Sequence, residues 1–311
     1  MIEYILEKSV FDEEDLVALL GIENYSEDYF KLLYRSAEYA RKTFVKGYVF
    51  AQLGINKAPC SGNCKFCDMA VCNCNAAPSA MSEAEVTEFA GKVKGISDFF
   101  VMTTADYDRE AFLGIMTAVR KSLDGNIRLV ANTGDFDYDY ALKLKAAGID
   151  ACYHIRRLRE GVDTDIPPKT REKTIEAIKK SGMELYYCIE PIGREHSAEE
   201  LAKEIMYAST LGVDVMAVMR RVNVKGTKFG GEEEITLAEL TKIAAVTMLA
   251  VKPKRSMNVH EPNAMTMLAG VNQLYAEYGH NPRDSADKTE DSRGMSVDGA
   301  KKLLRESEWI V

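Results

Sequence analysis

The chain has 311 residues, 46% hydrophobic and 28% charged, and this composition excludes collagen-like, disordered and low-complexity proteins. Its 40 lysines and arginines against 48 aspartates and glutamates give a net charge of −8, which argues against nucleic-acid binding through phosphates. The longest apolar run, Ile243 to Val251, is far shorter than the roughly 18 residues of a membrane span. No export signal is recognisable at the N-terminus, so we expect a soluble, cytoplasmic protein.

The first part of the chain has a helical pattern. A charged segment leads into Val17, Leu19 and Leu20, and a second amphipathic stretch runs from about Tyr29 to Phe44. No linker rich in Gly or Ser separates these helices from the segment that begins at Gly47. We therefore predict that residues 1–46 are a helical cap on a single domain.

From Gly47 onward, short apolar runs alternate with helical stretches, which predicts repeated βαβ units and a parallel sheet. The runs expected to be buried strands are Tyr48–Leu53, Phe99–Thr103, Ile127–Ala131, Ala151–Ile155, Leu185–Ile189, Val213–Val218, Met257–His260 and Gln273–Glu277. Eight strands within residues 47–278 predict an α/β fold, a closed (β/α)8 TIM-type barrel, with an open doubly wound sheet as the alternative. Residues 279–311 are predicted to be a polar tail that ends in a helix from Ser296 to about Glu306.

Five of the 7 cysteines fall between positions 60 and 74, which indicates metal or redox chemistry rather than disulfides. Cys60, Cys64 and Cys67 form a C-x3-C-x2-C triplet directly after the first predicted strand. Thiolates at this spacing can bind zinc or an iron–sulfur cluster, and plain buried thiols are the remaining alternative. Three ligands would leave one iron of a cubane open to a substrate group, and the triplet therefore favours iron–sulfur.

The triplet, with the aromatic Phe66 before its last cysteine, resembles the signature of the radical S-adenosylmethionine (SAM) enzymes. The resemblance implies that Cys60, Cys64 and Cys67 are catalytic and hold a [4Fe–4S] cluster, whose fourth iron is chelated by SAM. One electron would cleave SAM to a 5′-deoxyadenosyl radical that abstracts hydrogen from an unactivated carbon. It also implies an electron donor such as flavodoxin or ferredoxin.

Other segments, at 189–195, 222–229 and 264–272, resemble the biotin-synthase-like branch of that superfamily. The branch includes biotin synthase, split lipoyl synthases, an [FeFe]-hydrogenase maturase and methylornithine synthase. The likeness extends over about residues 47–278 and implies that this part of the chain is the radical SAM barrel.

One segment differs in sequence from the biotin synthase pattern. In biotin synthase, the fourth strand ends in Asn-His-Asn-Leu-Asp-Thr, a segment that binds substrate and SAM. This chain has Arg156, Arg157 and Arg159 in the corresponding stretch. Arginines suit carboxylates and phosphates, so we predict an anionic substrate, either a small molecule or a group on a carrier protein. A solvated or salt-bridged loop is the alternative.

The four cysteines outside the triplet are enough for a second, auxiliary iron–sulfur cluster. Cys72 and Cys74 follow Cys67 on the same loop, whereas Cys152 and Cys188 lie on the fourth and fifth predicted strands. Alternation along a strand leaves open which of these side chains point into the barrel. Buried packing is the alternative for the two strand cysteines.

Several polar residues stand at the ends of predicted strands, where the chemistry of such barrels is placed. Thr103, Thr104, Asn132 and Glu190 are predicted to bind SAM, with turns and a salt bridge as the alternatives. His260 is predicted to bind substrate. It lies near Arg255, in a region where biotin synthase keeps an arginine beside its sulfur-donating cluster.

These patterns leave three functions open. The first is sulfur insertion into an unactivated C–H bond, as in biotin or lipoyl synthase, with the auxiliary cluster as sulfur source. The second is a mutase or hydrogenase-cofactor maturase without sulfur chemistry, and the third is a zinc-stabilised barrel without turnover. A lipoyl-type substrate would fit a chain that works beside a paralogous partner.

Overall fold

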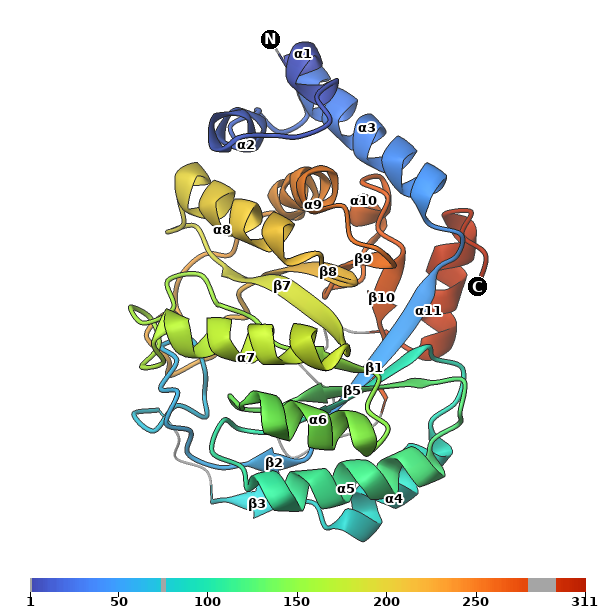
Figure 1. The fold of residues 1–311 in the computed structure, drawn as a ribbon. Coiled ribbons are helices and arrows are strands. Elements are labelled where there is room, and N and C mark those ends of the chain that lie inside the picture. The colour runs from blue at the N-terminus through green and yellow to red at the C-terminus, as the bar shows by residue number, and fades with distance from the viewer. Residues whose placement is uncertain (1, 74–76, 279–294) are drawn as a thin grey trace.

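The computed structural model describes residues 2–73, 77–278 and 295–311. Eight parallel strands close into a barrel in the order β1-β10-β9-β8-β7-β6-β5-β4, with helices around it (Figure 1). The barrel strands are β1 (Tyr48–Gly54), β4 (Asp98–Met102), β5 (Arg128–Asn132), β6 (Ala151–Tyr153), β7 (Glu184–Ile192), β8 (Val215–Arg220), β9 (Ser256–Val259) and β10 (Gln273–Tyr275). The predicted (β/α)8 barrel is thus confirmed, and the open-sheet alternative is wrong.

Two short strands were not predicted. β2 (Asn56–Lys57) and β3 (Ser79–Ala80) pair in an antiparallel fashion outside the barrel. The segment between them contains the cysteine triplet. The small ribbon therefore holds together the two ends of the loop that carries Cys60, Cys64 and Cys67, which we call the cysteine loop.

Local signals account for the starts and ends of the helices. Ser82 and Ser197 each form a capping box, and Gly182 ends its helix in the left-handed region with φ 74°. The helices of the barrel are α4 (Glu83–Lys92), α5 (Arg109–Ser122), α6 (Tyr138–Ala146), α7 (Pro168–Ser181), α8 (Ala198–Leu211), α9 (Leu237–Val251) and α10 (Ala264–Met267). They lie where the sequence pattern places the βα connections.

The N-terminal helices form a second layer outside α8 and α9 (Figure 1). These helices are α1 (Ile2–Leu6), α2 (Glu13–Leu20) and α3 (Glu27–Thr43). Tyr29 of α3 donates its hydroxyl hydrogen to the carbonyl of Ala238 at 3.1 Å, and Ser36 donates to the carbonyl of Ala269 at 2.7 Å. The layer explains the apolar run from Ile243 to Val251, because α9 is covered by helices on its outer side as well as by strands. No helix of the described segments is long and apolar enough to cross a membrane.

At the C-terminus, α11 (Val297–Glu306) packs on β1, which confirms the predicted last helix. Trp309 donates its indole N–H to the carbonyl of Val271 at 2.9 Å. The preceding stretch of the tail, 279–294, lies outside the described residues. The predicted domain limits at 46/47 and 278/279 stay predictions.

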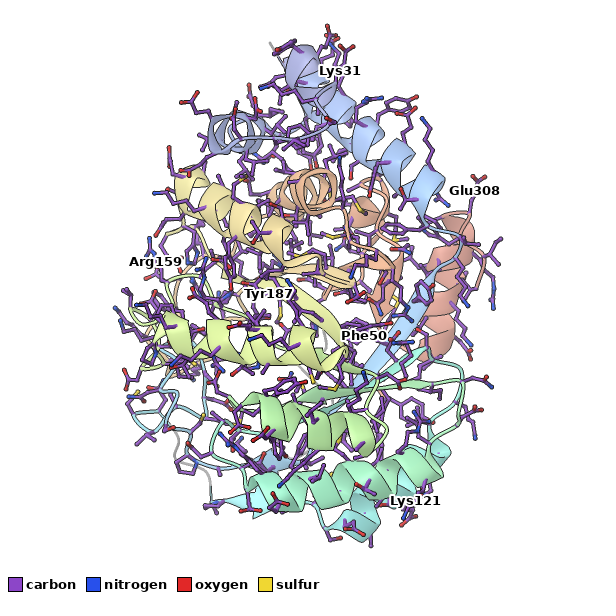
Figure 2. All side chains as sticks on the ribbon, in the orientation of Figure 1. Lys31, Phe50, Lys121, Arg159, Tyr187 and Glu308 are labelled. Carbon is purple, nitrogen blue, oxygen red and sulfur yellow. The ribbon has the colours of Figure 1, made fainter. Side chains whose placement is uncertain are left out.

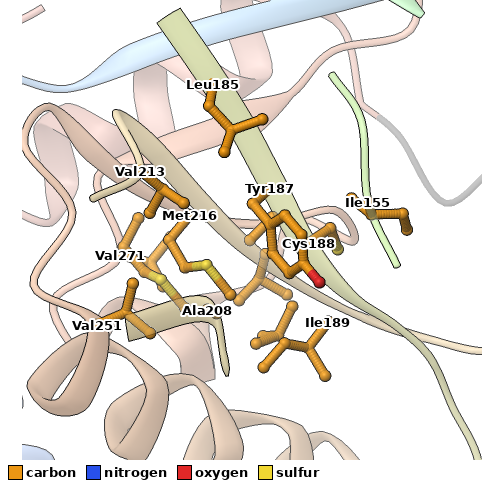
Figure 3. Close-up of a cluster of buried hydrophobic side chains, with 14 of the residues drawn as sticks. Ile155, Leu185, Tyr187, Cys188, Ile189, Ala208, Val213, Met216, Val251 and Val271 are labelled. Carbon is orange, nitrogen blue, oxygen red and sulfur yellow. The ribbon is translucent and has the colours of Figure 1, made fainter. Parts of the chain in front are cut away.

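The apolar core has two layers. Side chains between the strands and the helices form the larger one, of which Figure 3 shows the part around β7 and β8. A smaller cluster fills the inside of the barrel, and its members are Phe50, Phe100, Met102, Val130, Ala151, Tyr186, Val215 and Tyr275. Alternation along each strand thus sends one set of side chains inward and the other toward the helices.

Candidate functional site

A cavity of about 640 Å³ opens at the carboxyl ends of the barrel strands, which we call the mouth. It reaches down to the inner aromatic cluster, where Phe50 and Tyr186 line it. The loops after β1, β4, β5, β6 and β8 contribute the upper walls. This is the end at which (β/α)8 barrels place their chemistry.

The cysteine loop is tied to neighbouring loops by acidic residues that the sequence analysis missed. Ser61 donates its backbone N–H to the Asp106 carboxylate at 2.6 Å. Lys65 pairs with Asp163 at 3.1 Å, and its carbonyl accepts from the N–H of Lys228 at 3.1 Å. Loops from β4, β6 and β8 therefore hold the cysteine loop against the mouth.

The three thiols of the triplet line the same cavity, and each is partly buried. A Cβ placed on Gly62 would lie 3.6 Å from Sγ of Cys60 and 3.8 Å from Sγ of Cys64, so the two sulfurs face one small space. In the described part of the chain, no three His, Cys, Asp or Glu side chains meet around a point that suits a single ion. Three thiolates spread around one space are the ligand set of an iron–sulfur cluster.

Arg157 is the one predicted substrate arginine that lines the cavity. Its Nε lies 3.7 Å from Oε1 of Glu190, and this Nε is buried without a hydrogen-bond partner. Burial raises the pKa of the Cys64 thiol to about 11, against the lowering effect of the Arg157 guanidinium. A cation with hydrogen-bonding capacity to spare thus lies beside the triplet.

The other two arginines that were predicted to bind substrate, Arg156 and Arg159, do not line the cavity. Arg156 pairs with Glu204 at 2.8 Å and with Glu172 at 2.9 Å, and it lies 3.7 Å from the ring centre of Tyr207. Arg159 pairs with Glu200 of α8 at 2.7 Å. Figure 2 shows Arg159 at the edge of the molecule and Phe50 near its middle. Both residues thus form salt bridges, the arrangement that the alternative interpretation describes.

Of the cysteines predicted to hold an auxiliary cluster, the three that the structure describes, Cys72, Cys152 and Cys188, are not brought together. Cys188 lines the cavity, whereas Cys152 points outward and its Sγ lies 4.0 Å from Sδ of Met183. The neighbours of Cys152 on β6, Ala151 and Tyr153, belong to the inner side. The barrel wall therefore separates the two strand cysteines. Cys72 is exposed, and Cys74 lies outside the described residues.

The predicted SAM contacts all lie on the cavity wall. Thr103 shares a hydrogen bond of 2.8 Å with Thr133, and Asn132 stands beside it. Thr104 accepts a hydrogen bond from Nδ2 of Asn56 at 2.8 Å through its hydroxyl oxygen and donates its backbone N–H to Oδ1 of Asn56 at 2.9 Å. Its side chain is therefore less available to a ligand than those of the other predicted contacts.

His260, which is predicted to bind substrate, lines the lower part of the cavity and stacks on Tyr275 with ring centres 4.7 Å apart. Asn258, two residues earlier on β9, lines the same part and was missed. Both residues point inward because they are two positions apart along one strand. That parity is the signal that could have identified Asn258.

A second missed group stands on the wall of the mouth. His154 contacts Asp135 through Nε2 at 2.9 Å, and Asp135 also pairs with Arg171 at 3.0 Å and with Thr174 at 3.1 Å. Burial lowers the pKa of His154, so the ring is neutral and donates to the carboxylate. Burial acts to raise the pKa of Asp135, but its partners outweigh this and lower it to about 2.

No family model matches the chain. It is 24% identical over 257 residues to the biotin synthase of Clostridioides difficile, a match that covers 78% of each chain. It is 27% identical over 203 residues to the biotin synthase of Acetivibrio thermocellus, with 61% of this chain and 62% of that protein covered, less than two thirds of its length. These sequence similarities agree with the position of the three C-x3-C-x2-C thiols at the barrel mouth. The similarity to biotin synthases and the thiol triplet together support the radical SAM superfamily, in its biotin-synthase-like branch.

Solved structures share the fold of this chain. Methylornithine synthase superposes with a TM-score of 0.79 at 18% identity, over 99% of this chain and 95% of that one. The FeFe-hydrogenase maturase of Carboxydothermus hydrogenoformans gives a TM-score of 0.82 at 16% identity, over 99% of this chain and 78% of that one. Relatives in the superfamily imply a [4Fe–4S] cluster and SAM as cofactors, and the three thiols at the mouth fit such a cluster.

Proposed function

We propose that Cys60, Cys64 and Cys67 hold the [4Fe–4S] cluster of this radical SAM enzyme, and that SAM binds beside them in the cavity. The observation that carries this proposal is the convergence of three thiols from one loop on the mouth of the barrel. When bound, the cluster supplies the electron that cleaves SAM to a 5′-deoxyadenosyl radical. The loops that hold the cysteine loop in place set the position of all three ligands.

Residues of the cavity wall account for the binding of SAM in this proposal. Arg157 is the buried cation beside Cys64, and a carboxylate can fill the hydrogen-bonding capacity that Glu190 leaves unused. We therefore assign Arg157 to the SAM carboxylate rather than to the substrate. Asn132 and Thr103 offer a carboxamide and a hydroxyl at the opposite wall, on β5 and after β4.

The reaction that we favour is hydrogen abstraction from a substrate held below SAM, without sulfur insertion, as in a mutase or a maturase. Sulfur insertion rests on the likeness to biotin synthase, and the cysteine arrangement does not add to it. Cys188 is the one described cysteine on the cavity wall outside the triplet, while Cys152 lies behind the wall. A cubane needs more thiolates than one side chain supplies. A zinc-stabilised barrel without turnover is not supported by the enzyme relatives.

The physiological partners belong to the same proposal. A one-electron donor of the flavodoxin or ferredoxin class would reduce the cluster, which the open mouth leaves near the surface. The substrate is a small molecule, because the space below the triplet is enclosed by the barrel wall. A paralogous partner protein is not required by any feature of this arrangement.

Anaerobic reconstitution of single variants tests the assignment. The wild type should bind about four irons per chain and form 5′-deoxyadenosine from SAM with a strong reductant. Cys60→Ala, Cys64→Ala and Cys67→Ala should each abolish 5′-deoxyadenosine while keeping the far-ultraviolet circular dichroism of the wild type. Cys72→Ala, on the same loop but exposed, is the matched control and should behave as the wild type. SAM cleavage at the wild-type rate in any triplet variant would contradict the assignment of these cysteines to the cluster.

A further inference from the structure

The lower part of the cavity, which we call the chamber, has a composition unlike that of the mouth. It is lined by side chains that point inward from the barrel strands. They are Phe50, Gln52, Phe100, Met102, Tyr153, Tyr186, Cys188, Glu190, Val215, Ala217, Asn258, His260 and Gln273. Aromatic rings and carboxamides dominate this lining. A ligand that reaches the chamber therefore meets flat apolar faces and neutral hydrogen-bonding groups, with the Glu190 carboxylate and its neighbour Arg157 at the end toward the mouth.

The rings of the chamber form one connected wall together with Tyr275, a fully buried ring of the inner cluster. Phe50 lies 5.1 Å from Phe100, 5.4 Å from Tyr275 and 5.7 Å from His260, measured between ring centres. His260 and Tyr275 are nearly parallel, with 20° between their planes. Phe100 continues the wall to Tyr186 at 5.8 Å. Such a wall suits the face of another ring or an unsaturated group.

Two buried carboxamides stand among these rings. Gln52 is 5% exposed and its Nε2 lies 3.5 Å from Nε2 of His260. Asn258 is 3% exposed and donates its Nδ2 hydrogen to the carbonyl of Gln273 at 2.9 Å. A buried amide in an apolar wall makes hydrogen bonds, because leaving it unpaired costs free energy. These amides can exchange donors and acceptors with a ligand that is itself polar but uncharged.

Each cation near the chamber lies beside a carboxylate, and Arg157, whose Nε keeps hydrogen-bonding capacity, is the one that the proposed function assigns to SAM. Below it, Arg255 contacts the Asp98 carboxylate at 2.8 Å and 3.0 Å through its two terminal nitrogens. Above it, Arg157 lies beside Glu190, and Arg171 pairs with Asp135. In the described segments, the remaining lysine of the cavity lining is Lys225, an exposed residue of the loop after β8. An anionic group in the chamber would thus lie among rings and amides without a cation of its own.

We propose that the chamber binds the reacting part of an uncharged substrate that carries a ring or another flat unsaturated group and a hydrogen-bonding function. The rings contribute face contacts, and Asn258 and Gln52 contribute hydrogen bonds. This inference rests on the proposed function, which places SAM at the mouth above the chamber. It replaces the anionic substrate that the three arginines predicted.

Three probes with one ring and different charges test the proposal: benzamide, benzoate and benzamidinium. Binding to anaerobically reconstituted protein is measured by equilibrium dialysis, with and without saturating SAM. We expect benzamide to bind at least tenfold more tightly than benzoate or benzamidinium, and SAM to leave its binding in place. Equal or tighter binding of benzoate, displacement of benzamide by SAM, or no binding of any probe would each overturn the proposal.

A pair of variants on one strand locates the binding. Asn258→Leu removes the amide of the chamber, whereas Met257→Leu changes a side chain that packs on the helices. We expect benzamide binding to fall at least fivefold in Asn258→Leu and to stay at the wild-type level in Met257→Leu. An unchanged affinity in Asn258→Leu, or an equal loss in both variants, would place the probe elsewhere.

The two proposals fail separately. Wild-type protein that forms 5′-deoxyadenosine but prefers benzoate contradicts the substrate class alone. Triplet variants that still cleave SAM contradict the cluster assignment, whatever the probes show. The three-probe comparison needs no variant, so it holds even where Asn258→Leu does not fold.

Discussion

The two ends of the barrel interior are built on opposite principles. At the base, where the strands begin, the Asp98 carboxylate is fully buried and accepts from Arg255, from the Tyr186 hydroxyl at 2.7 Å and from Gln273 at 3.1 Å. Arg255 also lies 4.0 Å from the ring centre of Tyr48. At the mouth, the Nε of Arg157 is buried without a hydrogen-bond partner within the described chain.

The comparison separates groups that stabilise the fold from groups left for a ligand. A buried charge whose partners are all protein atoms contributes nothing to binding, but losing one partner is costly. A buried donor without a partner is costly in the free protein and is satisfied when a ligand arrives. Residues of the two kinds should therefore respond to substitution in different measurements.

The largest effect is expected at the base. Asp98→Leu leaves Arg255 buried without its carboxylate, which should lower the free energy of unfolding by about 3–5 kcal/mol. Urea unfolding of the protein without its cluster measures this. In the double variant Asp98→Leu, Arg255→Met both charges are gone, and we expect most of the lost stability to return. A double variant no more stable than Asp98→Leu would contradict the charge argument.

Two adjacent arginines give the sharpest test of the comparison. Arg156→Met leaves the largely buried Glu204 with a weaker set of partners, and should cost about 1.5–3 kcal/mol in urea unfolding. Arg157→Met should have the smaller effect on unfolding but should weaken SAM binding about ten- to hundredfold, because it removes a charge-assisted contact. Calorimetric titration of the reconstituted protein with SAM measures the second effect. Equal losses of SAM affinity in both variants would contradict the assignment.

The His154–Asp135 pair predicts a dependence of stability on pH. Asp135 has a folded pKa of about 2 against an ordinary 3.8, so its contribution is present above 3.8 and is lost as the pH falls through 2. The shift corresponds to roughly 2 kcal/mol. The lowered pKa of His154 acts in the same direction, with stability falling as the pH drops below 6.5.

The variant Asp135→Asn measures this contribution. It should be less stable than the wild type by roughly 2 kcal/mol at pH 7, and the difference should shrink below pH 4. Urea unfolding over a series of pH values gives both numbers. A difference that stays constant down to pH 2 would mean that the carboxylate charge is not responsible.

The smallest effect is expected for the two strand cysteines. Cys152→Ser and Cys188→Ser should each keep the wild-type iron content of about four per chain, because the barrel wall separates the two thiols. Iron and sulfide analysis after reconstitution measures this. A wild-type content of about eight irons that falls to about four in both variants would restore the auxiliary cluster and, with it, sulfur insertion.

Much of the fold could be predicted from the sequence. All eight barrel strands were found because parallel strands are buried on both faces and appear as short apolar runs. The triplet could be recognised because all three thiols come from one short loop, so they lie close together in the sequence and form a motif. The β2–β3 ribbon was missed, since two-residue strands such as Asn56–Lys57 leave no period to detect.

The direction of each side chain was decided only by the tertiary structure. Cys152 and Cys188 look alike in the sequence, as do Arg156 and Arg157. Yet Cys188 and Arg157 line the cavity, whereas Cys152 and Arg156 lie behind the wall with Met183 and Glu204. The sequence of a strand that is apolar on both faces does not show which face points into the barrel. The closure of the barrel determines which face that is. Composition and spacing thus determined the barrel and its cysteine loop, and closure decided which neighbouring residues belong to the site.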